Sequence, residues 1–264
     1  MPKSLLRICA FTLGLGQLWS GAAYADPSVS AYLVARHADR QNDFETAAEY
    51  YLEALFFDPD NALLAQGAID ALMAFGDFEK AAEVAETLPR PERANSTSNI
   101  ALIGDAAIES DYQRIVTLLE QDGVLINTLM DNLILGWAQV GLGNLDAGYA
   151  AFDRVIGDDR YKAIGLNHLG LAKAFVGDTQ GALDAFAAIA VGNFQTARTV
   201  LAEAQILASI DRRAEASRKL REAFGISPQV AGLLRRIESG AQIDFDLVTS
   251  ASDGMAEMFY TFAD

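Results

Sequence analysis

Residues 42–48 read Asn-Asp-Phe-Glu-Thr-Ala-Ala, and residues 76–82 read Gly-Asp-Phe-Glu-Lys-Ala-Ala, 34 positions later. Asp111-Tyr112 follows after another 34 positions. In a second register, shifted by one position, Gly143-Asn144-Leu145 and Gly177-Asp178-Thr179 are again 34 apart. A recurrence at a fixed period of roughly 20 to 50 residues is the signature of a repeat architecture. The chain is therefore predicted to be a linear array of similar units.

The recurring segment has the chemistry of a tight turn between two helices. A Gly or Asn at its start tolerates the positive φ that ends a helix, and the following Asp can accept hydrogen bonds from the first amides of the next helix. The chain is 51% hydrophobic and has only six prolines. Because alanine favours helix and proline interrupts it, this composition predicts a nearly continuous all-α structure.

A period of 34 positions resembles the tetratricopeptide repeat, a unit of two antiparallel helices with small residues and aromatics at fixed positions. The first repeat matches at Ala47, Tyr51, Ala54 and Pro59, and the fifth matches at Gly170, Ala182 and Phe186. The third departs most, with Ile115 and Asp122 where the family has alanine. The resemblance covers residues 28–228. It implies a right-handed superhelical solenoid of about six antiparallel helix pairs.

The resemblance divides the chain into three parts. Residues 1–25 read as a signal peptide, residues 28–228 as the solenoid, and residues 231–264 as a C-terminal helix, a linker and an uncapped apolar helix. The six predicted repeats lie near residues 28–61, 62–95, 96–128, 129–162, 163–196 and 197–230.

Residues 1–25 have the three parts of a secretory signal. Lys3 and Arg7 precede an apolar run over residues 8–18, and Ala23-Tyr24-Ala25 forms a small-x-small cleavage site. We therefore expect cleavage after Ala25 and export to the periplasm. The apolar run is too short to span a membrane, so no membrane insertion is expected. Cleavage would also remove Cys9, the single cysteine.

The exported chain would be strongly acidic. The signal contains two of the 20 basic residues and none of the 36 acidic ones, which leaves a net charge of −18. Such a charge repels nucleic acid, whose binding requires cationic side chains. Residues 210–236 nevertheless have a local charge of +4. The surface from Arg212 to Arg236 is either a solvated helix face or a docking patch for an acidic partner.

The sequence contains few residues suited to catalysis. His37 and His168 are the only histidines, and neither belongs to a metal-binding spacing. The chain has no GxSxG motif and no glycine-rich phosphate loop. Close carboxylate pairs such as Asp58/Asp60 suit helix caps at repeat junctions. We expect no enzyme activity, no cofactor and no metal.

The remaining function is recognition of another protein or peptide. In the resembled family a ligand lies in the concave groove lined by the first helix of each repeat. Trp137 and Phe175 could flank a pocket for an apolar anchor there, or could pack between repeats. The lysine and asparagine that grip a C-terminal carboxylate in some family members are absent. The residues placed in the groove by the resemblance are Tyr32, Arg36, Arg40, Gln66, Asp70, Met73, Ile100, Leu133, Trp137, Asn167, Leu171, Phe175 and Gln205.

Residues 254–264 form a last apolar segment, with Ser252 or Asp253 as the expected N-cap. Three explanations stay open for it: the front part of a longer repeat protein, a helix that folds back as a cap, or a self-association contact. Two functions follow. The first is a scaffold or adaptor in the bacterial cell envelope that binds a partner segment in its groove. The second is the repeat region of a longer envelope-assembly factor or enzyme.

Overall fold

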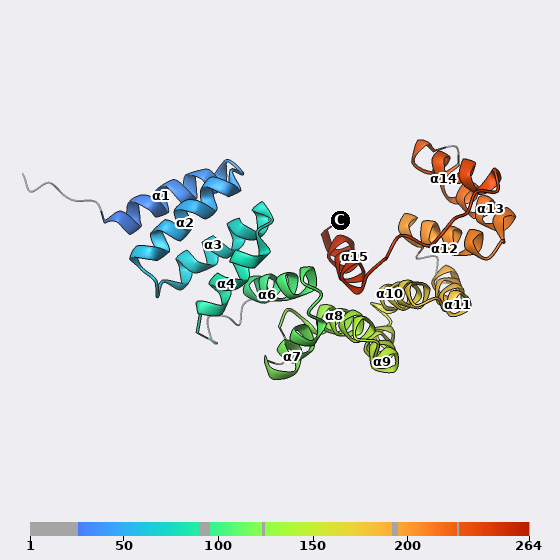
Figure 1. Ribbon diagram of the computed structural model, residues 1–264, viewed down its shortest axis with the longest axis horizontal. Coiled ribbons are helices and arrows are strands. Elements are labelled where there is room, and N and C mark those ends of the chain that lie inside the picture. Colours follow the sequence, from blue (N-terminus) through green and yellow to red (C-terminus); the bar gives the residue numbers. More distant parts are fainter. Residues whose placement is uncertain (1–25, 90–95, 123–124, 192–194, 226, 264) are drawn as a thin grey trace, which may run out of the picture.

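The computed structural model describes residues 26–89, 96–122, 125–191, 195–225 and 227–263. Over these ranges the chain forms fourteen α-helices and no β-strand (Figure 1). The predicted signal peptide and its cleavage site lie outside the described residues. The helices are α1 (Pro27–Arg40), α2 (Phe44–Phe57), α3 (Ala62–Phe75), α4 (Phe78–Thr87), α6 (Ser96–Ile108), α7 (Tyr112–Asp122), α8 (Thr128–Gly141), α9 (Leu145–Ile156), α10 (Lys162–Phe175), α11 (Thr179–Val191), α12 (Ala197–Ser209), α13 (Arg213–Phe224), α14 (Pro228–Glu238) and α15 (Ala251–Ala263).

Consecutive helices pack as pairs, and each pair contacts the next (Figure 1). The six pairs are α1/α2, α3/α4, α6/α7, α8/α9, α10/α11 and α12/α13. Each predicted repeat range corresponds to one pair, with α1, α8 and α10 beginning one position before their range. The predicted all-α solenoid of helix pairs is thereby confirmed. Helix α14 packs on α13 and extends the array by one helix.

The turn inside every pair contains one residue with a positive φ angle. These residues recur every 34 positions except for one step of 33, which explains the two registers in the sequence. The residue that follows accepts a helix-capping bond in most pairs: Asp43 from Thr46 N, Asp77 from Lys80 N, Asp111 from Arg114 N and Asp178 from Gly181 N. The predicted turn chemistry is thus confirmed. In the six turns inside the pairs, the residues with positive φ are Asn42, Gly76, Ser110, Gly143, Gly177 and Asp211.

Ser110 adopts the left-handed conformation, with φ 59°, without being glycine. This conformation costs an L-residue about 1–2 kcal/mol, whereas glycine loses more chain entropy on folding. The Ser110→Gly substitution is expected to raise the free energy of unfolding by up to about 1 kcal/mol. Urea denaturation measures the change.

The control for this substitution is Ser30→Gly, in the exposed first turn of α1. Ser30 has helical neighbours and no positive φ, so glycine there brings only its entropic cost. The control should therefore lower the stability by roughly 0.5 kcal/mol. A lower stability of Ser110→Gly than of wild type would contradict the expected relief of strain.

Glycines in the first helices receive the aromatic rings of the second helices. A Cβ added at Gly136 would lie 2.4 Å from the ring of Phe152, and one at Gly170 would lie 2.6 Å from Phe186. Both rings are fully buried. These aromatics therefore lie directly on the backbone of the partner helix, which allows the two helix axes to approach closely.

The buried apolar residues form two cores that meet in α6. The first core contains buried residues from Ala31 on α1 to Leu102 on α6. The second contains buried residues from Ile103 on α6 to Met258 on α15. An ion-pair network crosses the same junction: Arg114 on α7 binds Asp105 on α6 (2.7 Å) and Glu86 on α4 (2.8 Å). The two halves of the array are thus held together through α6 and α7.

After α14 the chain turns back along the solenoid. Residues 241–250 contain no helix, and α15 then packs against α8, α10 and α6 (Figure 1). Of the three explanations considered for the last segment, the structure shows the helix folded back. Its N-cap is Ser250, not Ser252 or Asp253. The Asp253 amide donates to Ser250 Oγ (3.0 Å), and the Ser250 amide donates to Asp253 Oδ2 (2.9 Å), which forms a capping box.

Candidate partner-binding groove

The first helices of the six pairs carry all thirteen predicted partner-binding residues. Where one helix carries several of them, they are spaced by three or four positions, so they share one face. The structure places Tyr32, Arg36 and Arg40 on α1, Gln66, Asp70 and Met73 on α3, Ile100 on α6, Leu133 and Trp137 on α8, Asn167, Leu171 and Phe175 on α10, and Gln205 on α12.

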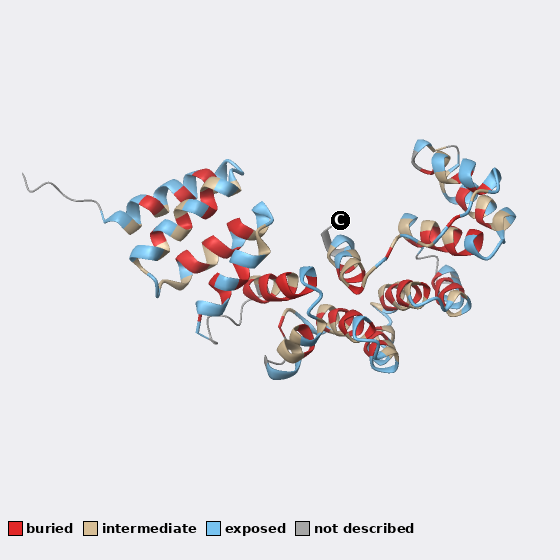
Figure 2. Cartoon of the chain, viewed as in Figure 1, coloured by how far each residue is buried: buried red, intermediate tan, exposed pale blue. Residues whose placement is uncertain are grey.

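The part of this layer formed by α1 and α3 is open to solvent (Figure 2). One further apolar side chain on each helix lies on the same face as the predicted residues, because it lies three positions before the first of them. Val29 on α1 is 51% exposed and Leu63 on α3 is 68% exposed. This surface thus combines exposed aliphatic groups with charges of both signs. Among its predicted residues, Arg36, Arg40 and Asp70 are exposed, while Tyr32, Gln66 and Met73 are half-buried.

The charged groups of the open surface influence one another. The surrounding protein atoms partly desolvate the exposed Asp70 carboxyl, which raises its pKa. A hydrogen bond from Gln66 (2.9 Å) acts in the opposite direction, and the nearby Asp39 raises that pKa further. Burial also raises the pKa of Tyr51, and the positive charge of Arg36 acts in the opposite direction. The arrangement offers a partner both a cation and a carboxylate.

The part of the layer formed by α8 and α10 is covered by α15. Leu133, Trp137 and Leu171 are buried, and Phe175 is half-buried. Gly254 of α15 lies on the indole of Trp137, since an added Cβ would be 2.3 Å from that ring. The predicted pocket for an external anchor between Trp137 and Phe175 is therefore not open in this conformation, and Trp137 contacts the chain itself.

The segment before α15 covers α12. Ile243 and Val248 are buried, and the side-chain amide of Gln205 donates to Asp246 Oδ1 (2.6 Å). On the neighbouring helix, Asn167 accepts a hydrogen bond from Thr199 (3.0 Å). Residues 241–263 therefore lie along the face where the resemblance placed a ligand.

A buried histidine lies behind Trp137. The Trp137 Nε1–H donates to His168 Nδ1 (3.0 Å), and the ring of Phe152 stacks on the imidazole at an interplanar angle of 20°. Because Nδ1 accepts this bond, the neutral imidazole carries its proton on Nε2. That atom has no hydrogen-bond partner among the described residues. Burial lowers the pKa of His168 to about 4. His168 is thus a neutral core residue that fixes the indole.

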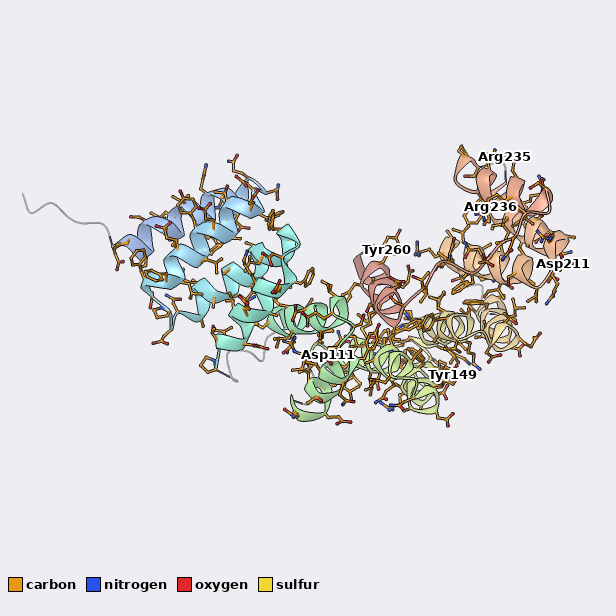
Figure 3. The ribbon with its side chains drawn as sticks, viewed as in Figure 1. Asp111, Tyr149, Asp211, Arg235, Arg236 and Tyr260 are labelled. Atoms are coloured by element: carbon orange, nitrogen blue, oxygen red, sulfur yellow. The ribbon has the colours of Figure 1, made fainter. Side chains whose placement is uncertain are left out.

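The basic surface from Arg212 to Arg236 is largely paired with local carboxylates. Arg235 and Arg236 lie at the end of α14 (Figure 3), where Arg236 donates to the carbonyl of Gln242 (3.3 Å). The other cations bind acids of the same region, which favours a solvated helix face over a docking patch. These pairs are Arg212–Glu215, Arg213–Asp211, Arg218–Glu222, Lys219–Glu203 and Arg221–Glu238.

An array of helix pairs in which each pair packs on the next defines a helical-repeat solenoid. The family model described as tetratricopeptide repeat matches residues 40–98, from the end of α1 to the start of α6. This match supports a tetratricopeptide-repeat protein, and repeats of this family generally mediate protein–protein interaction. A comparison with curated proteins found no match.

Proposed function

We propose that this protein is an interaction scaffold or adaptor of the bacterial cell envelope, and that it binds a segment of another protein on the open face of α1 and α3. The main support is the exposed mixture of aliphatic and charged side chains on that face, which includes Leu63, Arg36 and Asp70. A patch of exposed apolar groups rimmed by polar residues is typical of interaction sites. The same layer already accommodates a polypeptide helix further along the array, at α8 and α10.

The envelope location rests on the sequence of residues 1–25. Their positive start, apolar run and Ala23-Tyr24-Ala25 have the order of a secretory signal. Within the described ranges, none of the helices has the length and apolarity needed to cross a membrane. The proposed working form is therefore the chain from Asp26 onward in the periplasm.

The Leu63→Asp substitution tests the proposed surface. Leu63 is exposed and lies in the first turn of α3, where an acidic residue is compatible with the helix. The chain from Asp26 onward is used to capture proteins from a periplasmic extract, and the captured proteins are identified. Their affinities for the wild-type chain and for Leu63→Asp are then measured. Loss of an apolar contact in the interface is expected to weaken binding at least about tenfold.

Phe56→Asp is the matched control. Phe56 is 80% exposed but belongs to α2, a second helix, and so lies outside the proposed surface. It should leave the affinity unchanged. Equal binding by wild type and Leu63→Asp, or an equal loss with Phe56→Asp, would contradict the proposed surface. Circular dichroism verifies that all three proteins are equally helical.

A further inference from the structure

The C-terminal helix α15 shows what the groove of α8, α10 and α12 can bind. Its buried residues Ala251, Gly254, Met255 and Met258 lie on one helical face, at relative positions 0, 3, 4 and 7. Gly254 contacts Trp137 without a side chain between them. This part of the groove therefore accepts an amphipathic helix that presents a small residue to the indole.

Polar contacts fix the orientation of α15 along its length. Near its start, the hydroxyls of Ser252 and Tyr112 share a hydrogen bond (3.2 Å). Further along, Glu257 forms a two-pronged ion pair with Arg198 at the start of α12. The guanidinium of Arg198 also lies 5.3 Å from the centroid of the Tyr260 ring. An acidic residue three positions after the glycine is thus part of the recognised pattern.

The fit of α15 is incomplete at its far end. A cavity of about 320 Å³ remains between α15 and helices α10, α11 and α12. Ile164 of α10 and Ile189 of α11 line it on one side, and Tyr260 and Thr261 of α15 line it on the other. Tyr260 lies near the C-terminal end of α15 (Figure 3) and is 54% exposed. Thr261, seven positions after Gly254, is too small to fill the space. A helix with a larger apolar residue there would bury more apolar surface.

We propose that the groove of α8, α10 and α12 is a second helix-binding site, gated by α15, whose ligand is a helix of another protein. The ligand helix has a small residue over Trp137, at the place of Gly254. Counted from that residue, it has aliphatic residues or methionine at positions +1 and +4 and an acidic residue at position +3. At position +7, the place of Thr261, it has a bulky apolar residue. Such a helix competes with α15 because it also fills the cavity. Without any helix in the groove, Trp137, Leu133 and Leu171 would form an unfavourable apolar patch, so displacement of α15 requires a replacement. This site is separate from the proposed surface on α1 and α3.

The test uses the chain from Asp26 onward and labelled peptides with the sequence of residues 248–263. Gly254→Leu removes the space over Trp137 and is expected to release α15. Trp137 is the only tryptophan after Trp19, so a red shift of the emission reports the release. The peptide is expected to bind Gly254→Leu at least about tenfold more tightly than wild type, because the internal competitor is gone. A Thr261→Leu peptide should bind about tenfold more tightly than the unchanged peptide.

Gly232→Leu is the matched control, since a Cβ at Gly232 meets no atom within 4 Å. It should behave as wild type. If Gly254→Leu fails to fold, Glu257→Arg replaces it as the variant that releases α15. It places a second cation beside Arg198 and so repels α15 from α12, without enlarging a buried residue. Absence of peptide binding to both released variants would overturn the proposal. So would a dimer in which α15 of a second copy fills the groove, or equal affinity of the two peptides.

Discussion

Replacing Trp137 with alanine is expected to lower the free energy of unfolding by about 4 kcal/mol. The side chain is fully buried and packs edge-on against Phe152, with ring centroids 5.7 Å apart. Alanine would leave a cavity between α8, α9, α10 and α15 and would remove the hydrogen bond to His168. Urea denaturation followed by far-ultraviolet circular dichroism measures the effect.

Phe56→Ala provides the comparison, because that ring is mostly exposed on α2. Its substitution should change the stability by less than about 0.5 kcal/mol. A similarly small effect of Trp137→Ala would show that the indole does not join α15 to the solenoid. Such a result would contradict the covered groove.

Acidification is expected to destabilise the protein through His168. Its pKa in the folded state is lowered to about 4 from an ordinary value of 6.5. The unfolded chain therefore binds a proton that the folded chain excludes. The stabilisation from neutral His168 is complete above pH 6.5 and decreases as the pH falls from 6.5 to 4. The loss over this window amounts to about 3 kcal/mol.

The His168→Gln variant separates this contribution from those of other groups. Glutamine retains an acceptor for the Trp137 Nε1–H but does not titrate. Carboxylates with altered pKa values, such as Asp131, contribute equally to both proteins and cancel in the difference. The stability of wild type should therefore decline more steeply between pH 6.5 and pH 4. Parallel curves would contradict a buried neutral His168.

The helix pairs could be predicted because their determinants are local and repeated. The left-handed turn residue and the following Asp lie within a few positions of each other, as at Gly76 and Asp77. Small residues recur where helices approach, as at Gly136 and Gly170. Each of these features depends on neighbours inside one repeat, so a single sequence is sufficient to recognise them.

The position of α15 could not be predicted, because its contacts join residues far apart in the sequence. Ser252 meets Tyr112, and Gly254 meets Trp137. The apolar face of α15 is visible in the sequence as a helical stripe, but a stripe does not identify its partner surface. Ser250 and Asp253 have capping-box spacing, a local signal for the true start of this helix. The role of His168 depends on the same long-range packing.

The central claim is that the open face of α1 and α3 binds another protein. The most direct test places a photo-crosslinking amino acid at Leu63 or at Phe56 and irradiates cells that produce the protein. Both positions are exposed, but only Leu63 belongs to the proposed face. We expect a discrete crosslinked partner from Leu63 and none from Phe56. Crosslinking to a partner from Phe56 alone, or none from Leu63, would contradict the claim.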